Sequence, residues 1–350
     1  MSFKRLEIDD FVISNDSITS TAWSDNVPTL TTFYSNSIQE ASSAGTYYLS
    51  VYNTSSTDQA VQFDIAYCDN LGSGSSLYNN AVPANSPTKT LYGQYRSMIL
   101  EDENLNFVFG SSVQTGIDAC GVTITSNTAV ISNHFWILNV ERARYKQSLF
   151  PGSFNLTLSG SGGQRLLHIT DNSNDITTIP FIGSTRAYQL VSGSNGTGIS
   201  SNSGYTATSG SYGIMFPDLG VIMLNPLAIS ESIHLEPSRS NDSNGNNNIS
   251  MFNSINLGAS FGLNSQENIS SDYVFVRARN SEFNYSENPS FISGSTGEVI
   301  YSNFINAPQT YITTVGMYND MNELVAVAKM SRPLLKDFTK EALIRVKLDF

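Results

Sequence analysis

The stretch from Thr310 to Phe350 carries the most regular pattern in this 350-residue chain. Near its end, apolar and charged residues alternate strictly in the order Ile344, Arg345, Val346, Lys347, Leu348, Asp349 and Phe350. Because successive side chains of a strand point to opposite faces, residues 343–350 are predicted to form a half-buried β-strand. Chain ends are seldom so strictly patterned, so we expect this strand to be paired.

A second pattern in the same stretch predicts a β-hairpin. Residues 311–318 are rich in β-branched and aromatic side chains, residues 324–329 are mainly apolar, and a short polar turn separates them. Two strand-like runs joined by turn residues are typical of a hairpin. The amphipathic stretch 335–342 is expected to add one or two helical turns. These patterns predict structural elements and indicate no catalytic or binding residue.

The composition favours a globular, β-rich protein. Hydrophobic residues make up 40% of the chain, and charged residues only 14%, against about 25% in an average soluble protein. Ser, Thr, Asn and Gly take the place of the missing charges, which is typical of strands joined by many turns. A net charge of -12 argues against a nucleic-acid partner, because phosphate binding needs clustered Lys and Arg. An acidic balance would instead keep a concentrated assembly subunit soluble.

The predicted fold class is mainly β, with antiparallel β-sandwich-like domains and one main helix at about 86–100. Ser86 offers an N-cap for that helix, Pro87 suits its first position, and apolar or aromatic residues follow near helical spacing. Strand-like runs occur elsewhere along the chain, among them 45–52, 61–67, 135–140, 154–158 and 273–279.

The character of the chain changes between residues 159 and 265, where clusters of Gly, Ser and Asn separate short apolar islands. We expect this region to be a β insertion with long loops. Residues 1–158 and 266–350 are then expected to form a β core domain together, or two packed β domains.

No catalytic motif is found in the sequence. His134, His168 and His234 have no His or Cys at ligand spacing, and no nucleophile elbow, dinucleotide fingerprint or zinc signature occurs. The Gly/Ser loop 69–76 lacks the Gly-Lys-Ser/Thr of a phosphate loop. The stretch 241–246 lacks the carboxylate that completes a calcium loop. We therefore expect no enzyme, no metal and no cofactor.

The remaining features concern redox state, membranes and charge. Cys68 and Cys120 are the only cysteines, and two separate buried thiols are favoured, with a disulfide left open. The chain has no apolar run as long as a membrane span and no signal-peptide core, so synthesis in a cytoplasm without export and without membrane contact is expected. Arg142, Arg144 and Lys146 form a small basic patch that is interpreted as a strand end with solvated charges.

Several stretches together resemble a known family. They are Asp64-Ile65-Ala66-Tyr67, Leu71-Gly72-Ser73-Gly74, Leu91-Tyr92-Gly93-Gln94-Tyr95-Arg96, Arg142-Ala143-Arg144-Tyr145-Lys146, Phe150-Pro151-Gly152-Ser153-Phe154, Thr310 to Tyr318, Glu323 to Lys329, Phe338, and Leu343 to Phe350. They resemble virion structural proteins of large contractile-tailed bacteriophages of the marine cyanophage and jumbo-phage type. The resemblance covers about residues 60–155 and 270–350, and it brings no catalytic residues.

This resemblance implies a structural subunit of a virion, made in the cytoplasm of a bacterial host. A baseplate or tail position is implied first, and a neck, collar or fibre-attachment position second. The partners would be other virion proteins and copies of the chain itself. The rival function is a carbohydrate-binding adhesin at a fibre tip, which would use exposed Tyr and Asn/Asp-rich loops. A polysaccharide depolymerase would need carboxylates facing each other across a groove.

Two apolar islands in the long-loop region are the candidate interface residues. They comprise Ile214, Met215, Phe216, Val221, Ile222, Met223 and Leu224. Apolar islands in polar surroundings are unfavourable to expose, so a neighbouring subunit could cover them. The equally weighted alternative is that they fold back on their own domain.

Overall fold

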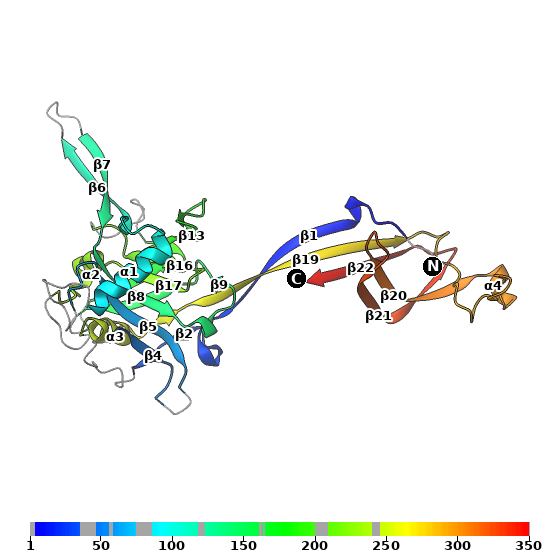
Figure 1. Ribbon diagram of the computed structural model, residues 1–350, viewed down its shortest axis with the longest axis horizontal. Coiled ribbons are helices and arrows are strands. Elements are labelled where there is room, and N and C mark those ends of the chain that lie inside the picture. The colour runs from blue at the N-terminus through cyan, green and yellow to red at the C-terminus, as the bar shows by residue number, and fades with distance from the viewer. Residues whose placement is uncertain are drawn as a thin grey trace. The chain divides into compact units, whose positions relative to one another are not determined.

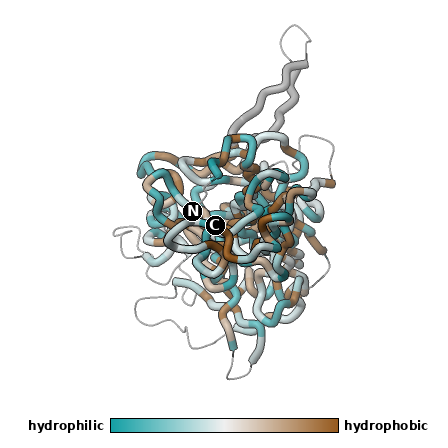
Figure 2. Tube along the Cα trace, turned by 90° about the vertical axis from the view of Figure 1, so that its right-hand side faces the viewer, coloured by the Kyte–Doolittle hydropathy of each residue, from teal (hydrophilic) through white to brown (hydrophobic). Residues whose placement is uncertain are grey.

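The computed structural model confirms a mainly β chain, with 44% of it in strands and 17% in helices. The structure describes residues 4–35, 47–55, 59–74, 86–117, 123–160, 163, 165–199, 209–239 and 246–349. The chain divides into a larger unit, Ile18–Glu267, and a smaller unit that combines Met1–Ser17 with Asn268–Phe350. The trace in Figure 2 alternates short apolar and polar segments, as expected where apolar strands are joined by polar turns.

One twelve-stranded sheet organises the larger unit, and its strands pair antiparallel. The strand order is β2-β18-β10-β11-β14-β16-β17-β8-β5-β4-β3, and β15 pairs with β14. In that order the strands are Thr29–Leu30, Phe261–Gly262, Asn155–Ser159, Leu166–Asp171, Tyr188–Ser194, Gly213–Phe216, Val221–Leu224, His134–Val140, Val61–Asp69, Leu49–Tyr52 and Tyr34–Ser35, with β15 at Thr197–Gly198.

Both faces of the central strands are buried, and β8 shows how. Trp136, Leu138 and Val140 belong to one apolar core, whereas Phe135 and Ile137 belong to the other. Because side chains alternate along a strand, the two sets point to opposite faces of the sheet. The first core contains residues of α2 (Pro226–Ile233) and α3 (Asn246–Gly258), and the second contains residues of α1 (Pro87–Leu100). The sheet is therefore covered by helices on each side (Figure 1).

Two of these helices begin with a proline at the first helical position and end at a left-handed residue. The predicted main helix is confirmed as α1, which starts after Ser86 and stops at Glu101, where φ is 59°. Helix α2 was not predicted. Its N-cap is Asn225, whose side chain accepts a hydrogen bond from the Leu227 backbone N–H, and it stops at His234.

The two apolar islands lie in β16 and β17, in the middle of this sheet, and the interface prediction for them is wrong. All seven side chains are 0 to 2% exposed: Ile214, Met215, Phe216, Val221, Ile222, Met223 and Leu224. The two strands pair with each other, and β17 also pairs with β8. A strand buried on both faces needs a continuous apolar run, which explains the sequence of the islands without a partner.

The expected division of the chain also differs from the observed one. Strands β11, β14, β16 and β17 come from region 159–265, yet they are hydrogen bonded into the same sheet as β5 and β8. The region is therefore part of the larger core and not an insertion into it.

Smaller elements complete the larger unit. They are the sheet of β6 (Val108–Ile117) with β7 (Thr123–Ile131), the sheet of β12 (Phe181–Ile182) with β13 (Thr185–Arg186), strand β9 (Ser148–Leu149), and the 3-10 helices Ser24–Asn26 and Arg142–Arg144. Strand β9 pairs with the first residues of β19.

The smaller unit contains the sheet β1-β19-β22 and a separate hairpin, β20-β21. Strands β1 (Phe11–Thr21) and β19 (Asn264–Ala278) also run on into the larger unit. Strand β22 (Ala342–Asp349) confirms the predicted terminal strand, and it pairs antiparallel with residues 271–278 of β19. The hairpin of β20 (Gln309–Tyr318) and β21 (Leu324–Asp337) is also confirmed. A 3-10 helix, Ile8–Asp10, and helix α4, Asn303–Asn306, lie in the same unit.

The helical turns expected at 335–342 are absent from the structure. Leu335 and Lys336 instead pair with Tyr311 and Thr310, so β21 continues to Asp337. The register shifts between Ile312–Leu334 and Thr314–Lys329, and this irregularity takes up Pro333. Proline is tolerated at such a bulge because it has no N–H to donate to a regular ladder.

We predict that Phe261→Ala destabilises the larger unit by about 3–5 kcal/mol, the usual effect of removing a buried aromatic side chain. Phe261 is 0% exposed, and its ring lies 4.8 Å from Trp23, 5.1 Å from Phe63 and 5.7 Å from Phe154, measured between centroids. Urea unfolding followed by tryptophan fluorescence tests this, because Trp23 and Trp136 both lie in the larger unit. Phe181→Ala, at a 61% exposed residue, is the matched control. Equal midpoints for the two variants would contradict the prediction.

Candidate functional site

Few apolar side chains are buried in the described part of the smaller unit, and many are exposed. The buried ones are Val274, Ala278, Ala342 and Val346, and the ladder places Val274 opposite Val346 and Ala278 opposite Ala342. The large exposed ones are Ile8, Phe11, Val12, Ile13, Tyr285, Ile300, Tyr301, Ile305, Tyr311, Tyr318, Met321, Leu324, Val325, Val327, Phe338 and Leu343. This unit therefore presents apolar surface that its own core does not use.

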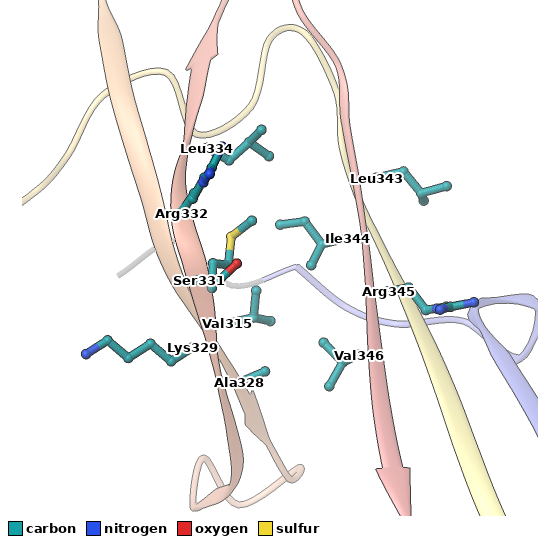
Figure 3. Close-up of a pocket in the computed structure, with 11 residues that line it drawn as sticks. Val315, Ala328, Lys329, Ser331, Arg332, Leu334, Leu343, Ile344, Arg345 and Val346 are labelled. Carbon is teal, nitrogen blue, oxygen red and sulfur yellow. The ribbon is translucent and has the colours of Figure 1, made fainter.

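A groove of about 430 Å³ lies between the β20-β21 hairpin and β22. Its lining residues are Val315, Ala328, Lys329, Met330, Ser331, Arg332, Leu334, Leu343, Ile344, Arg345 and Val346. Figure 3 shows Val315 and Ala328 on the hairpin side pointing toward Ile344 and Val346 on β22. The hairpin and β22 thus face each other through apolar side chains and leave a gap between them.

The alternation of the strands explains why the groove is apolar. Val315 and Ala328 are half-buried on the inner face of the hairpin, and Ile344 is half-buried next to buried Val346 on β22. The outer face of the hairpin is also apolar in part, since Tyr311, Val325 and Val327 are 65%, 69% and 57% exposed. A two-stranded hairpin is only marginally stable in water without packing on at least one face.

The charges around the groove are all positive. Lys329, Arg332 and Arg345 are lining residues, and the described lining contains no Asp or Glu. Within the described residues, no carboxylate is close enough to pair with any of these three cations. The Arg345 guanidinium lies 5.5 Å from the Tyr273 ring centroid. On a chain of net charge -12, the groove is therefore a local region of positive potential.

A buried lysine anchors the far end of β21. Lys336 is 0% exposed, and its ammonium donates to the Asn280 carbonyl at 3.1 Å, the Asn284 Oδ1 at 2.7 Å and the Asp337 carbonyl at 3.0 Å. Three acceptors match the three ammonium protons, which makes the burial of this charge tolerable. The contact ties the loop 280–284 to the hairpin and so supports one wall of the groove.

A second polar cluster lies in the larger unit around Asp69. Its carboxylate is 0% exposed and forms an ion pair of 3.0 Å with Arg239, while the Leu71 N–H donates to it at 2.8 Å. His134 sits opposite Asp69 on the neighbouring strand. Burial lowers the pKa of His134, and the nearby Arg239 guanidinium lowers it further, against the opposing effect of Asp69. This cluster closes the end of the β5-β8 ladder.

The other sequence candidates have local, structural contacts. The Thr157 hydroxyl is 3.0 Å from His168 Nδ1, and His234 caps the end of α2. Arg142 donates to the Tyr145 carbonyl at 2.7 Å and lies over that ring, so it packs locally as well as being charged. Cys68 is a free, buried thiol whose pKa is raised by burial. Cys120 and residues 241–245 lie outside the described residues.

Comparisons with known proteins identify no relative. No protein-family model matches the sequence, and neither a curated protein nor a solved structure shows a significant match. In the part of the chain that the structure describes, no group of three or more His, Cys, Asp or Glu is placed to hold a metal ion. No helix there has the length and apolar character needed to cross a bilayer.

Sequence reasoning missed the groove because its residues come from three strands that are separate in sequence. One signal was available. Residues 324–328 carry apolar side chains on consecutive positions, so the hairpin has apolar groups on both faces, which an isolated half-buried hairpin does not need.

We predict that Lys336→Met lowers the stability of the smaller unit by about 1–3 kcal/mol, because it leaves the buried Asn284 Oδ1 without its donor. The Asn280 and Asp337 carbonyls still accept from the Asn284 side chain and from the Lys340 N–H. Faster hydrogen exchange at residues 334–337 would show the effect. Lys340→Met is the matched control, since that side chain is 54% exposed, and we expect a change within about 0.5 kcal/mol. Equal protection from hydrogen exchange at residues 334–337 in both variants would contradict the stabilising role of Lys336.

We also predict that His134 makes the larger unit less stable as pH falls. Its folded pKa lies below the ordinary 6.5, so the unfolded chain binds the proton more readily. The stabilisation is complete above pH 6.5 and is lost as pH drops toward the folded pKa. His134 Nδ1 is also buried without a hydrogen-bond partner within the described residues.

Urea unfolding at a series of pH values tests this prediction by comparing the natural chain with His134→Gln. The natural chain should lose more unfolding free energy than the variant between about pH 7.5 and 5.5, on either side of the ordinary histidine pKa. If the unfolding free energies of the two chains changed equally with pH over this range, the prediction for His134 would be contradicted.

Proposed function

We propose that this chain is a structural subunit of a tailed-bacteriophage virion, acting through protein–protein interfaces rather than catalysis. A baseplate or tail position is proposed first, with a neck, collar or fibre-attachment position as the alternative. The proposal rests on the sequence resemblance over residues 60–155 and 270–350. The structural observation that carries it is the uncovered apolar β surface of the smaller unit.

The physical argument concerns what that surface requires. The β20-β21 hairpin exposes Tyr311, Val325 and Val327 on one face and borders an open apolar groove on the other. Exposed apolar patches of this kind are typical of interaction surfaces. A partner that covers them would supply the burial that the smaller unit lacks. The partners proposed are other virion proteins and further copies of this chain, with no nucleic acid and no membrane.

The alternative function is a carbohydrate-binding adhesin at a fibre tip. The observation in its favour is a pair of exposed tyrosines, Tyr285 and Tyr301, at 59% and 56% exposure, in the segment that leads to α4. Exposed aromatic rings with polar neighbours can stack on sugars. Binding of the isolated chain to a glycan array at micromolar strength, without affinity for tail components, would favour this function over assembly.

We predict that the chain sediments with intact particles when an infected-cell lysate is separated on a density gradient, and that it stays there after a high-salt wash. Val325→Asp with Val327→Asp should release it into the soluble fraction, because carboxylates on the outer hairpin face would be desolvated on assembly. Thr313→Asp with Thr314→Asp controls for added charge on the opposite strand. Natural chain found only at the top of the gradient would contradict the proposal.

A further inference from the structure

We infer that the groove between the β20-β21 hairpin and β22 binds the segment Glu7–Ile13 of a second copy of this chain. This inference rests on the proposed function and adds a partner and a binding mode to it. Two surfaces of the same unit carry it, one cationic and concave, the other acidic and apolar.

The groove supplies an apolar interior with cations beside it. Val315 and Ala328 point across the gap toward Ile344 and Val346, while Lys329 and Arg345 point outward from its two sides (Figure 3). A segment whose apolar side chains enter the gap would place its charged neighbours over those sides. Carboxylates are the charges that such flanks favour, because Lys329, Arg332 and Arg345 have no carboxylate partner within the described residues.

The segment Glu7–Ile13 has the complementary pattern. It reads Glu-Ile-Asp-Asp-Phe-Val-Ile, with three carboxylates among four apolar side chains. Ile8 is 91% exposed and Ile13 is 71% exposed, with Phe11 and Val12 near one half. Exposure of this much apolar surface beside carboxylates is unfavourable for an isolated chain and is relieved by burial in an apolar, cationic groove.

The segment does not occupy the groove of its own chain. Lys4 donates to the Arg277 carbonyl and forms an ion pair of 3.5 Å with Glu282. Strand β1, which begins within the segment at Phe11, lies on the opposite side of β19 from β22 in the sheet order. Among the described residues, none that lines the groove comes from the N-terminal part. The described part of the segment therefore leaves the groove of its own chain to a second copy.

Contact between two different surfaces of identical chains is heterologous, so it extends from copy to copy until a ring closes or a filament grows. The overall charge of -12 repels copies from one another and disfavours random contacts. Local attraction between the acidic segment and the cationic groove would select this contact over others.

Sedimentation velocity of the purified full chain, over a concentration series, tests the inference. We expect reversible self-association that weakens as salt rises, because salt screens the charge pairs. Lys329→Glu with Arg332→Glu should weaken association at least about tenfold, and so should Asp9→Lys with Asp10→Lys, because each juxtaposes like charges. An equimolar mixture of the two variants should associate as the natural chain does, since the charges are then exchanged. Lys340→Glu, an exposed cation outside the groove, is the control.

A second measurement does not depend on the charged substitutions. A labelled peptide of residues 5–15 should bind the natural chain, and Ala328→Phe, which fills the groove, should abolish that binding. A peptide of the same composition in scrambled order should not bind. Circular dichroism and tryptophan fluorescence would show that each variant is folded.

The outcomes separate this inference from the proposed function. A chain that stays monomeric up to about 100 μM, far above typical specific affinities, overturns the second-copy assignment. Association that neither charge variant changes overturns the groove as its site. In both cases the chain can still sediment with particles through a different partner, so the gradient experiment decides the proposed function independently.

Discussion

Burial of the central sheet on both faces is the constraint on which the larger unit depends. Strands β5, β8, β16 and β17 have α1 on one side and α2 with α3 on the other, so each residue in them must be compatible with a core. The same requirement explains the aromatic rings that pack together in the two cores, such as Tyr67 with Trp136 at 6.0 Å in one and Phe107 with Phe135 at 5.0 Å in the other, measured between centroids. At the end of β5 the apolar run stops at the buried Asp69, whose carboxylate pairs with Arg239.

The smaller unit differs from the larger one, because many of its strands carry apolar side chains that its own packing does not bury. Each layer there is thin: the three strands β1, β19 and β22 of one sheet, and a two-stranded hairpin. In the described part of this unit, neither layer has a helix of more than four residues to cover it, since α4 spans only Asn303–Asn306. A thin sheet gains little from burial. The apolar side chains left over on the hairpin are the reason to place interfaces in this unit.

The sequence predicts the elements of this fold better than their assembly. The alternation in 343–350, the hairpin at 311–329 and the proline-initiated helix at 86–100 are local patterns, and all three are confirmed. The pairing of β17 with β8 joins residues about eighty positions apart, which no local pattern encodes. The helical turns expected at 335–342 failed for a related reason. Pairing with β20 overrides the weak amphipathic pattern of that stretch.

The candidate site shows why dense apolar islands are poor guides to an interface. Ile214 to Phe216 and Val221 to Leu224 are the most apolar stretches of their region, and they are core because two-sided burial demands such runs. Interface surface must also be compatible with water before assembly, so it is diluted with polar and charged residues. The hairpin fits this description, with Tyr311, Val325 and Val327 set among Thr, Gly and Lys. In a chain this rich in strands, apolar residues on the otherwise polar face of an alternating strand indicate a docking surface more specifically than dense apolar islands do.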